Sequence, residues 1–276
     1  MGFERAKLLL AGLMLAFAVL ELARGGFFQR RGATWKDTLL DAISTVTLPL
    51  LIVPTIFTVA PALVEAVAPG TEGLLAHWPG WAMFGALLIA DDLTQYWWHR
   101  LSHRTWLFPL HRAHHSAPYM SIRLVYRNNL VYYLLMPGIW LSAVLVYWGL
   151  GAVYGVYIVC KMAVIISAHS DQPWDAPLYR TAPRLMWWVE RIVSTPATHS
   201  AHHGLHKSDG ITHYDGNFGN FLFLWDVIFG TAHITRQRPA AYGLEGLVPV
   251  GLLRELLLPV PAKRSVEGAE CTTTGL

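Results

Sequence analysis

Residues 81–115 read WAMFGALLIADDLTQYWWHRLSHRTWLFPLHRAHH. The first part of this stretch, 81–98, is apolar and long enough to cross the roughly 30 Å of hydrocarbon in a bilayer. Five histidines follow it directly, between 99 and 115. The stretch therefore predicts a membrane helix that carries a cluster of imidazoles at its end.

The composition supports membrane embedding of the whole chain. Of its 276 residues, 54% are hydrophobic and 14% are charged, and the mean hydropathy is +0.36. Soluble domains carry about 25% charged residues, so this chain has too little polar surface to cover a water-soluble globule. Further apolar stretches suited to crossing lie near 6–23, 38–67, 130–149 and 151–169.

These stretches predict an all-α, multi-pass membrane helical bundle. The stretch 38–67 contains Pro49, Pro54 and Pro61, so we expect it to be kinked or broken into a helix pair. The last two stretches are joined only around Gly149–Gly151, which predicts a tight helical hairpin. We expect one integral-membrane domain over residues 1–276, with a mobile tail at 262–276.

The basic residues indicate an orientation. Lysine and arginine occur in 24–37, in 99–129 and after 169, whereas 68–80 and the turn near 150 have none. By the positive-inside rule the basic side is cytoplasmic, which places a histidine-rich cap on the cytoplasmic face. The net charge is only +3 and the basic residues form no stripe, so nothing favours nucleic acid as a partner.

Three histidine clusters carry the predicted chemistry. Residues three and four apart share a helix face, so each cluster can direct its imidazoles to one point. Burying eight imidazoles beside membrane spans is costly without a partner, and a metal removes that cost. Eight nitrogens exceed the four that a tetrahedral zinc takes, and they suit two ions with open positions. The clusters are His99 and His103; His111, His114 and His115; and His199, His202 and His203.

Polar residues near these clusters are candidates to orient the imidazoles. Metal-bound histidines usually donate their second N–H to a carboxylate or carbonyl. Asp92 lies seven residues before His99, two helical turns away on the same face, and Asp226 and Asn217 are further candidates. We expect no catalytic residue apart from the metal ligands, and the roles of His206 and His213 stay open.

Motif by motif, the chain resembles the fatty acid hydroxylase/sterol desaturase superfamily. The matching segments, over roughly 80–235, are DLTQYWWHRLSH (92–103), HRAHHS (111–116), STPATHSAHHG (194–204), DGNFG (215–219) and WDVIFGT (225–231). The resemblance implies a non-haem di-iron enzyme that uses O2 to hydroxylate or desaturate a lipid. It departs from the family pattern at Ser200, where arginine is frequent, and at Phe218, where tyrosine is usual.

Within the superfamily, the chain is similar to the branch of alkylglycerol monooxygenase and bacterial lipid hydroxylases. In that branch a further histidine stands near the end of a membrane helix, and His169 occupies this place here. No glycine-rich dinucleotide motif is present, so the resemblance implies an external electron donor: a reductase, cytochrome b5 or ferredoxin.

Two other functions remain open from the residues alone. One is a membrane metal-binding or transport protein, which would place ligands along a path through the bilayer. The other is a zinc-dependent lipid hydrolase, and zinc is also able to replace iron during purification. The sequence does not name the lipid, separate hydroxylation from desaturation, or give the oligomeric state.

Overall fold

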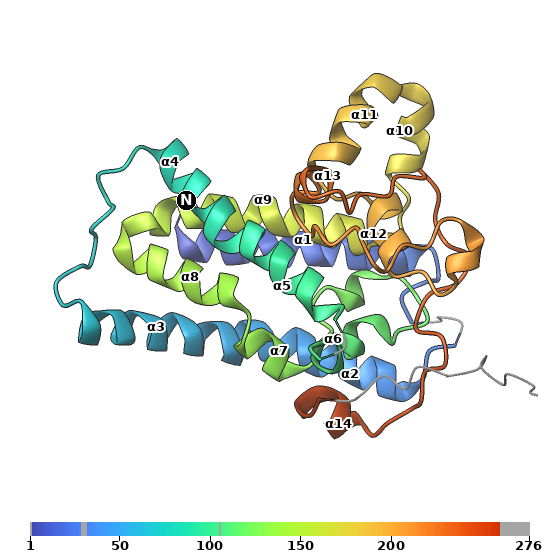
Figure 1. The fold of residues 1–276 in the computed structure, drawn as a ribbon, viewed down its shortest axis with the longest axis horizontal. Helices are drawn as coiled ribbons and strands as arrows, with labels where there is room; N and C mark the ends of the chain where they lie inside the picture. The colour runs from blue at the N-terminus through green and yellow to red at the C-terminus, as the bar shows by residue number, and fades with distance from the viewer. Residues whose placement is uncertain (1, 29–31, 105, 260–276) are drawn as a thin grey trace, which may run out of the picture.

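The computed structural model describes residues 2–28, 32–104 and 106–259. Within them, helices are the regular elements, and β pairing is limited to two isolated bridges, Val193 with Leu222 and Gly204 with Tyr242. The long helices run along the long axis of the molecule, and short helices collect at one end (Figure 1). The all-α prediction is confirmed for the described residues, whereas the predicted tail at 262–276 lies outside them.

Among the residues that the structure describes, three helical runs are long and apolar enough to cross a membrane: Glu4–Ala23, Trp35–Val67 and Leu130–His169. The first belongs to α1 (Phe3–Ala23), which packs along α9 (Gly151–His169). The third begins with α7 (Leu130–Leu134) and α8 (Pro137–Leu145) and continues through the π-helical segment η4 (Val146–Leu150) into α9.

The predicted hairpin between 130–149 and 151–169 is present. Gly149 has φ of 111°, a conformation that glycine adopts readily and other residues avoid, and the chain reverses there between α8 and α9 (Figure 1). Beyond the turn, α8 packs against η2 (Leu88–Leu93) and α3 (Val53–Val67), and α9 packs against α1 and α4 (Gly80–Leu87). A side chain at this position would also meet the backbone of Ala76 at 2.9 Å. The turn thus depends on glycine for both its conformation and its close packing.

The proline-containing stretch stays one helical run. Thr34 caps α2 (Trp35–Thr47) in a reciprocal capping box with Asp37. The run then passes through a π-helical segment, η1 (Leu48–Ile52), into α3 (Val53–Val67), and α2 and α3 lie end to end in Figure 1. Pro49 and Pro54 fall within or just after η1, where the regular hydrogen-bond ladder is already interrupted, so the helix is not split into a pair.

The segment predicted to cross at 81–98 is helical but is not one of the three apolar runs. It consists of α4 (Gly80–Leu87), the π-helical η2 (Leu88–Leu93) and α5 (Thr94–Ser102). Asp91 and Asp92 interrupt its apolar character, and both are buried. Acidic residues in such a helix face the bundle interior, and Asp91 pairs there with Lys161 of α9 at 2.7 Å. Its crossing of the membrane stays a prediction.

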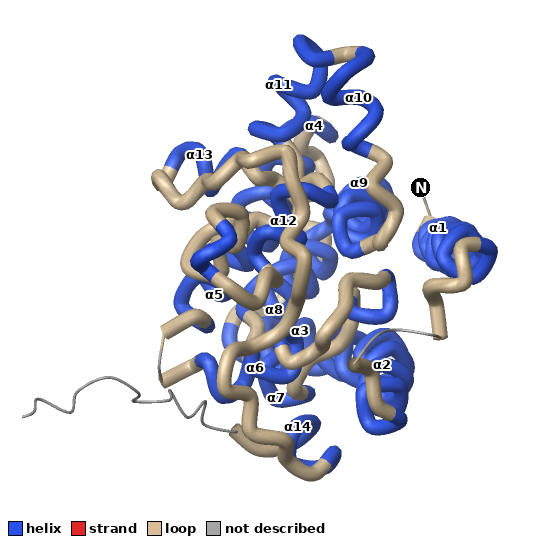
Figure 2. The backbone as a smooth tube through the Cα atoms, turned by 90° about the vertical axis from the view of Figure 1, so that its right-hand side faces the viewer, coloured by secondary structure: helices blue, strands red, loops and turns tan. Residues whose placement is uncertain are grey.

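Short helices form the cap at the end of the bundle where α5 and α9 finish. Figure 2, which looks at this end of the molecule, shows them joined by long loops. At this end, the last residues of α5 and α9 lie next to the other histidine-bearing helices. Its elements are α6 (Phe108–His115), η3 (Ile122–Leu124), α10 (Asp175–Thr181), α11 (Pro183–Ile192), α12 (Pro196–His202), η5 (Lys207–Asp209), α13 (Leu224–Ile228) and α14 (Leu252–Leu257).

Candidate metal centre

The nine histidines singled out from the sequence meet beneath this cap. They come from the ends of α5 and α9, from α6 and from α12, with His103 and His203 at the C-caps of their helices. Eight of the nine side chains are buried, and His103 is partly buried. Three parts of the sequence, 99–115, 169 and 199–203, thus bring their imidazoles together.

The imidazoles divide into two groups. Within each group, one ring nitrogen from every residue lies within 4.8 Å of the corresponding nitrogen of all the others. The first group is His99, His103, His111, His115 and His202, and the second is His114, His169, His199 and His203. Each group has the size and donor type of a site for one metal ion.

His99 and His202 show why the first group suits a cation. Nδ1 of His99 donates to the carbonyl of Phe218 at 2.7 Å, and Nδ1 of His202 donates to the carbonyl of Gly216 at 2.7 Å. In the neutral rings the Nε2 atoms therefore carry lone pairs, yet they face each other at 3.0 Å. Two unprotonated nitrogens at this distance repel each other unless a cation lies between their lone pairs. The spacing fits an ion between them.

In the second group, backbone carbonyls orient two of the four rings in the same way. Nδ1 of His114 donates to the carbonyl of Arg127 at 3.0 Å, and Nδ1 of His169 donates to the carbonyl of Ile165 at 2.8 Å. Nε2 of His169 then faces Nε2 of His199 at 2.9 Å. Within the described part of the chain, Nδ1 of His199 and Nε2 of His203 are buried without a hydrogen-bond partner. Unpartnered buried nitrogens beside oriented imidazoles fit a second ion.

The electrostatic environment keeps these rings neutral. Burial is the main cause, and neighbouring imidazoles add to it, so that the pKa falls well below the ordinary value of 6.5. Neutral imidazole is the form that binds metals. The residues whose pKa is lowered in this way are His103, His111, His114, His115, His199, His202 and His203.

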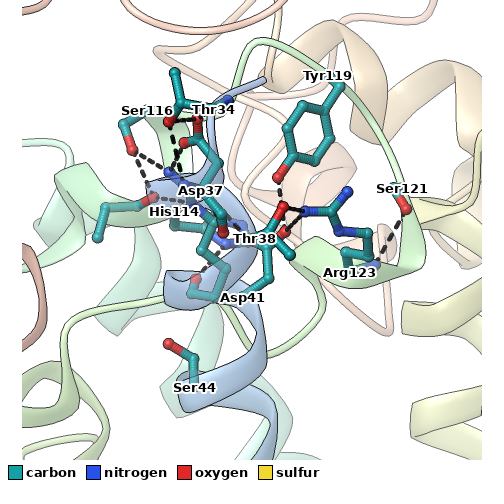
Figure 3. Close-up of polar contacts among 12 residues, drawn as sticks. Thr34, Asp37, Thr38, Asp41, Ser44, His114, Ser116, Tyr119, Ser121 and Arg123 are labelled. Carbon is teal, nitrogen blue, oxygen red and sulfur yellow. Dashed lines mark hydrogen bonds and ion pairs between the residues drawn. The ribbon is translucent and has the colours of Figure 1, made fainter. Parts of the chain in front are cut away.

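A buried ion-pair network stands behind His114. The backbone carbonyl of Arg127 accepts from His114. The guanidinium of the same residue pairs with Asp37 at 2.8 Å and with Asp41 at 2.9 Å. Arg123 contacts Asp41 from the other side at 2.7 Å. Figure 3 shows the two carboxylates of α2 between these segments, with His114 next to them. Helix α2 thereby fixes the chain that orients one imidazole of the second group.

The acidic partners expected for the imidazoles bond elsewhere. Asp92 accepts from the backbone N–H of Leu222 at 3.2 Å and from Nε1 of Trp225 at 2.8 Å. It thus fastens the loop before α13 to the bundle, and backbone carbonyls take the place that we expected for its carboxylate. A carbonyl partner leaves no mark in the sequence, so the four carbonyls described above could not have been found there.

Asp226 and Asn217 act on the loop that carries two of these carbonyls, those of Gly216 and Phe218. Asp226 is fully buried and accepts from the N–H groups of Phe218 at 2.8 Å and Gly219 at 2.6 Å and from the hydroxyl of Thr231 at 2.6 Å. Burial raises the pKa of this carboxyl, and these three bonds oppose the rise. Asn217 has a left-handed backbone with φ of 55° and donates to the carbonyl of Thr198.

The two histidines left open by the sequence lie outside both groups. His206 is exposed and contacts Glu245 at 2.7 Å, and the ring of His213 packs against His233. Neither contact is directed toward the nine imidazoles.

A family model described as fatty acid hydroxylase matches residues 84–231, more than half of the chain and all nine histidines. The chain belongs to the fatty acid hydroxylase family. The resemblance found in the motifs is therefore confirmed. This member of the family has no match among solved structures.

Similar curated proteins agree with the family. The human (Homo sapiens) alkylglycerol monooxygenase is 26% identical over 165 residues, covering 59% of this chain and 33% of the relative. The zebrafish (Danio rerio) alkylglycerol monooxygenase is 26% identical over 167 residues, covering 56% and 30%. Rice (Oryza sativa subsp. indica) very-long-chain aldehyde decarbonylase GL1-6 is 24% identical over 184 residues, covering 61% and 26%. The chain thus aligns with about a third or less of the length of each of these relatives.

Proposed function

We propose that this protein is a membrane-bound, O2-dependent oxidoreductase that hydroxylates or desaturates a C–H bond of a lipid with two histidine-bound iron ions. The observation that carries the proposal is the pair of imidazole groups, in which Nε2 of His99 faces Nε2 of His202 at 3.0 Å and Nε2 of His169 faces Nε2 of His199 at 2.9 Å. Family membership and the names of the relatives, a monooxygenase and an aldehyde decarbonylase, support lipid oxidation.

The nine histidines would hold one ion in each group. Iron, when bound, supplies the activation of O2 and the redox equivalents that no side chain in the site offers. The chain contributes orientation, because backbone carbonyls fix Nδ1–H of His99, His114, His169 and His202 and leave Nε2 free to bind. It also shields the site from solvent, since eight of the nine rings are buried.

A cavity of about 270 Å³ leads from the bundle interior to both groups. His99 and His111 of the first group and His114 and His169 of the second line it. Most of its remaining wall is apolar, which suits a lipid chain. The C–H bond to be oxidised would lie where the cavity reaches the histidines.

The electrons for this reaction would come from outside the chain, from a reductase, cytochrome b5 or ferredoxin. The histidine-bearing helix ends lie under the cap, and we place this end on the cytoplasmic face because the basic segments belong to it. A soluble or membrane-associated donor would reach the centre there.

The alternatives predict different arrangements. A transport protein would distribute ligands along a path through the bilayer, whereas these nine imidazoles form two compact groups where α5 and α9 end. A zinc-dependent lipid hydrolase would act without O2 and would transfer no oxygen from it to the product.

Labelled O2 and lipid mass spectrometry together test the proposal. Cells that express the protein are expected to make a lipid that has gained one oxygen atom from isotope-labelled O2, or one that has lost two hydrogens. His114→Ala and His202→Ala should abolish this product, because each removes a ligand from one group. His206→Ala, at an exposed position outside the groups, is the control and should retain it. A product that forms without O2 would contradict the proposal.

A further inference from the structure

The apolar cavity contains a polar ledge that the metal centre does not use. Its members are Asp91, Gln95, Ser142 and Lys161, contributed by η2, α5, α8 and α9. Asp91, Ser142 and Lys161 are between 1% and 5% exposed, so the ledge lies in the interior of the bundle. Polar groups in such a place are costly unless something meets their hydrogen bonds.

Several of these groups have hydrogen-bonding capacity to spare. Within the described residues, Oγ of Ser142 and Oε1 of Gln95 are buried and have no partner. Nζ of Lys161 donates to Oδ2 of Asp91 at 2.7 Å, and the hydroxyl of Tyr157 donates to the same oxygen at 2.9 Å. An ammonium group has three donors, so the bond to Asp91 leaves two that can serve an acceptor in the cavity.

The ledge stands at a defined depth below the histidines. Asp91 precedes His99 by eight residues, and Lys161 precedes His169 by eight residues. At about 1.5 Å per residue, the ion pair lies about 12 Å along both helices from the level of the metal centre, and Gln95 about 6 Å. A chain that reaches the histidines through the cavity therefore passes the ledge.

The charges of the ledge restrict what it can bind. Lys161 is matched by Asp91, and the adjacent carboxylate of Asp92 is buried as well. Lys7, the other lysine among the described residues that line the cavity, pairs with Glu4 at 2.8 Å. A carboxylate or phosphate at the ledge would therefore lose its hydration without meeting an unmatched cation. An uncharged oxygen would instead accept from Lys161 or Ser142 without this penalty. A hydroxyl would in addition donate to the unpartnered Oε1 of Gln95.

We infer that the ledge binds an uncharged oxygen-bearing group, a hydroxyl, ether or carbonyl, on an otherwise apolar lipid chain. The inference rests on the proposed function, because it names the substrate class of that same cavity. It assigns Ser142, Gln95 and Lys161 to substrate binding and gives them no role in holding metal.

Binding of radiolabelled 1-hexadecanol to the purified protein in detergent tests the inference. Unlabelled 1-hexadecanol should displace the radiolabelled alcohol about tenfold better than hexadecane or hexadecanoate does at equal mole fraction. A tenfold difference is what one or two net hydrogen bonds contribute to binding. The three competitors share a chain and differ at its end, and the comparison needs no variant. Equal displacement by hexadecane and 1-hexadecanol, or stronger displacement by hexadecanoate, would overturn the inference.

Variants locate the selectivity. Ser142→Ala and Gln95→Leu should each weaken 1-hexadecanol binding about fivefold and leave hexadecane binding unchanged, because each removes one hydrogen bond. Ser167→Ala is the matched control, since its hydroxyl bonds to the carbonyl of Val164 in α9 and does not line the cavity. A loss that is equal for both ligands would show that the ledge is only structural.

Binding requires neither iron nor O2, so the two proposals can fail separately. If the protein binds 1-hexadecanol selectively but oxidises no lipid, the proposed function is refuted and the lipid-binding role of the ledge is supported. Oxidation without selectivity for the alcohol would remove the ledge and keep the oxidoreductase.

Discussion

Asp226 holds the loop whose carbonyl accepts from His99, and Asp226→Asn is expected to weaken one metal group and spare the other. The carboxylate accepts from Phe218, Gly219 and Thr231. In the variant, the amide nitrogen would face one of these donors, most directly the N–H of Gly219, which now bonds to the second carboxylate oxygen. The Phe218 carbonyl would then shift from its place 2.7 Å from Nδ1 of His99.

The expected size of the effect follows from the bonds lost. One hydrogen bond to a charged group and one buried donor left unsatisfied together destabilise a protein by about 2–4 kcal/mol. For a chain of this length, that corresponds to a fall in Tm of about 4–16 °C. Loss of the group that orients a metal ligand usually weakens metal binding by about 10–100-fold.

The assay combines thermal unfolding with metal analysis after dialysis against graded chelator. Asp226→Asn is expected to lose the ion of the first group at about 10–100-fold lower chelator than the wild type and to retain the second ion. Asp209→Asn is the matched control, because Asp209 also accepts from two backbone N–H groups and a threonine hydroxyl but is exposed. If Asp226→Asn kept both ions, or lost both together, the positioning of His99 by this loop would be refuted.

Three further predictions concern packing, charge and pH. Gly138→Ala should lower Tm by an amount equivalent to about 1–3 kcal/mol, because the added Cβ would lie 2.6 Å from Oδ1 of Asp91. Gly85→Ala, where the added Cβ meets open space, should lower Tm far less, and equal losses of Tm in the two variants would count against this packing. Arg127→Met should destabilise the protein by about 3–5 kcal/mol in thermal unfolding, since it leaves the buried carboxylate of Asp41 with one cation fewer, and an unchanged Tm would contradict this. Metal-free protein should lose stability as the pH falls below about 6.5, because burial lowers the pKa of the histidines and only the unfolded chain then takes up protons; a Tm that is constant between pH 7 and 5 would oppose this.

The histidine pattern in the sequence predicted which residues meet, but it did not predict how they divide. His114 and His115 follow each other on α6, about 100° apart around the helix, and they belong to different groups. His202 and His203 at the end of α12 separate in the same way. This division depends on how α5, α6, α9 and α12 pack together, and spacing within one helix does not contain that information.

The backbone groups that hydrogen-bond to the imidazoles and to Asp92 could not be predicted for a related reason. Helical periodicity placed Asp92 on the same face as His99, two turns away. Asp92 instead lies in the π-helical segment η2 and bonds to Leu222, in the loop before α13, and to Trp225 of α13. The hairpin at Gly149, by contrast, was predictable, because a glycine between two apolar helices is a local signal.

Iron content after anaerobic reconstitution tests the central claim most directly. The wild-type protein should hold two ions per chain, whereas His99→Ala and His169→Ala, which alter different groups, should each hold one. A wild-type chain that binds a single ion, or variants that lose no iron, would show that the two groups do not hold a metal pair.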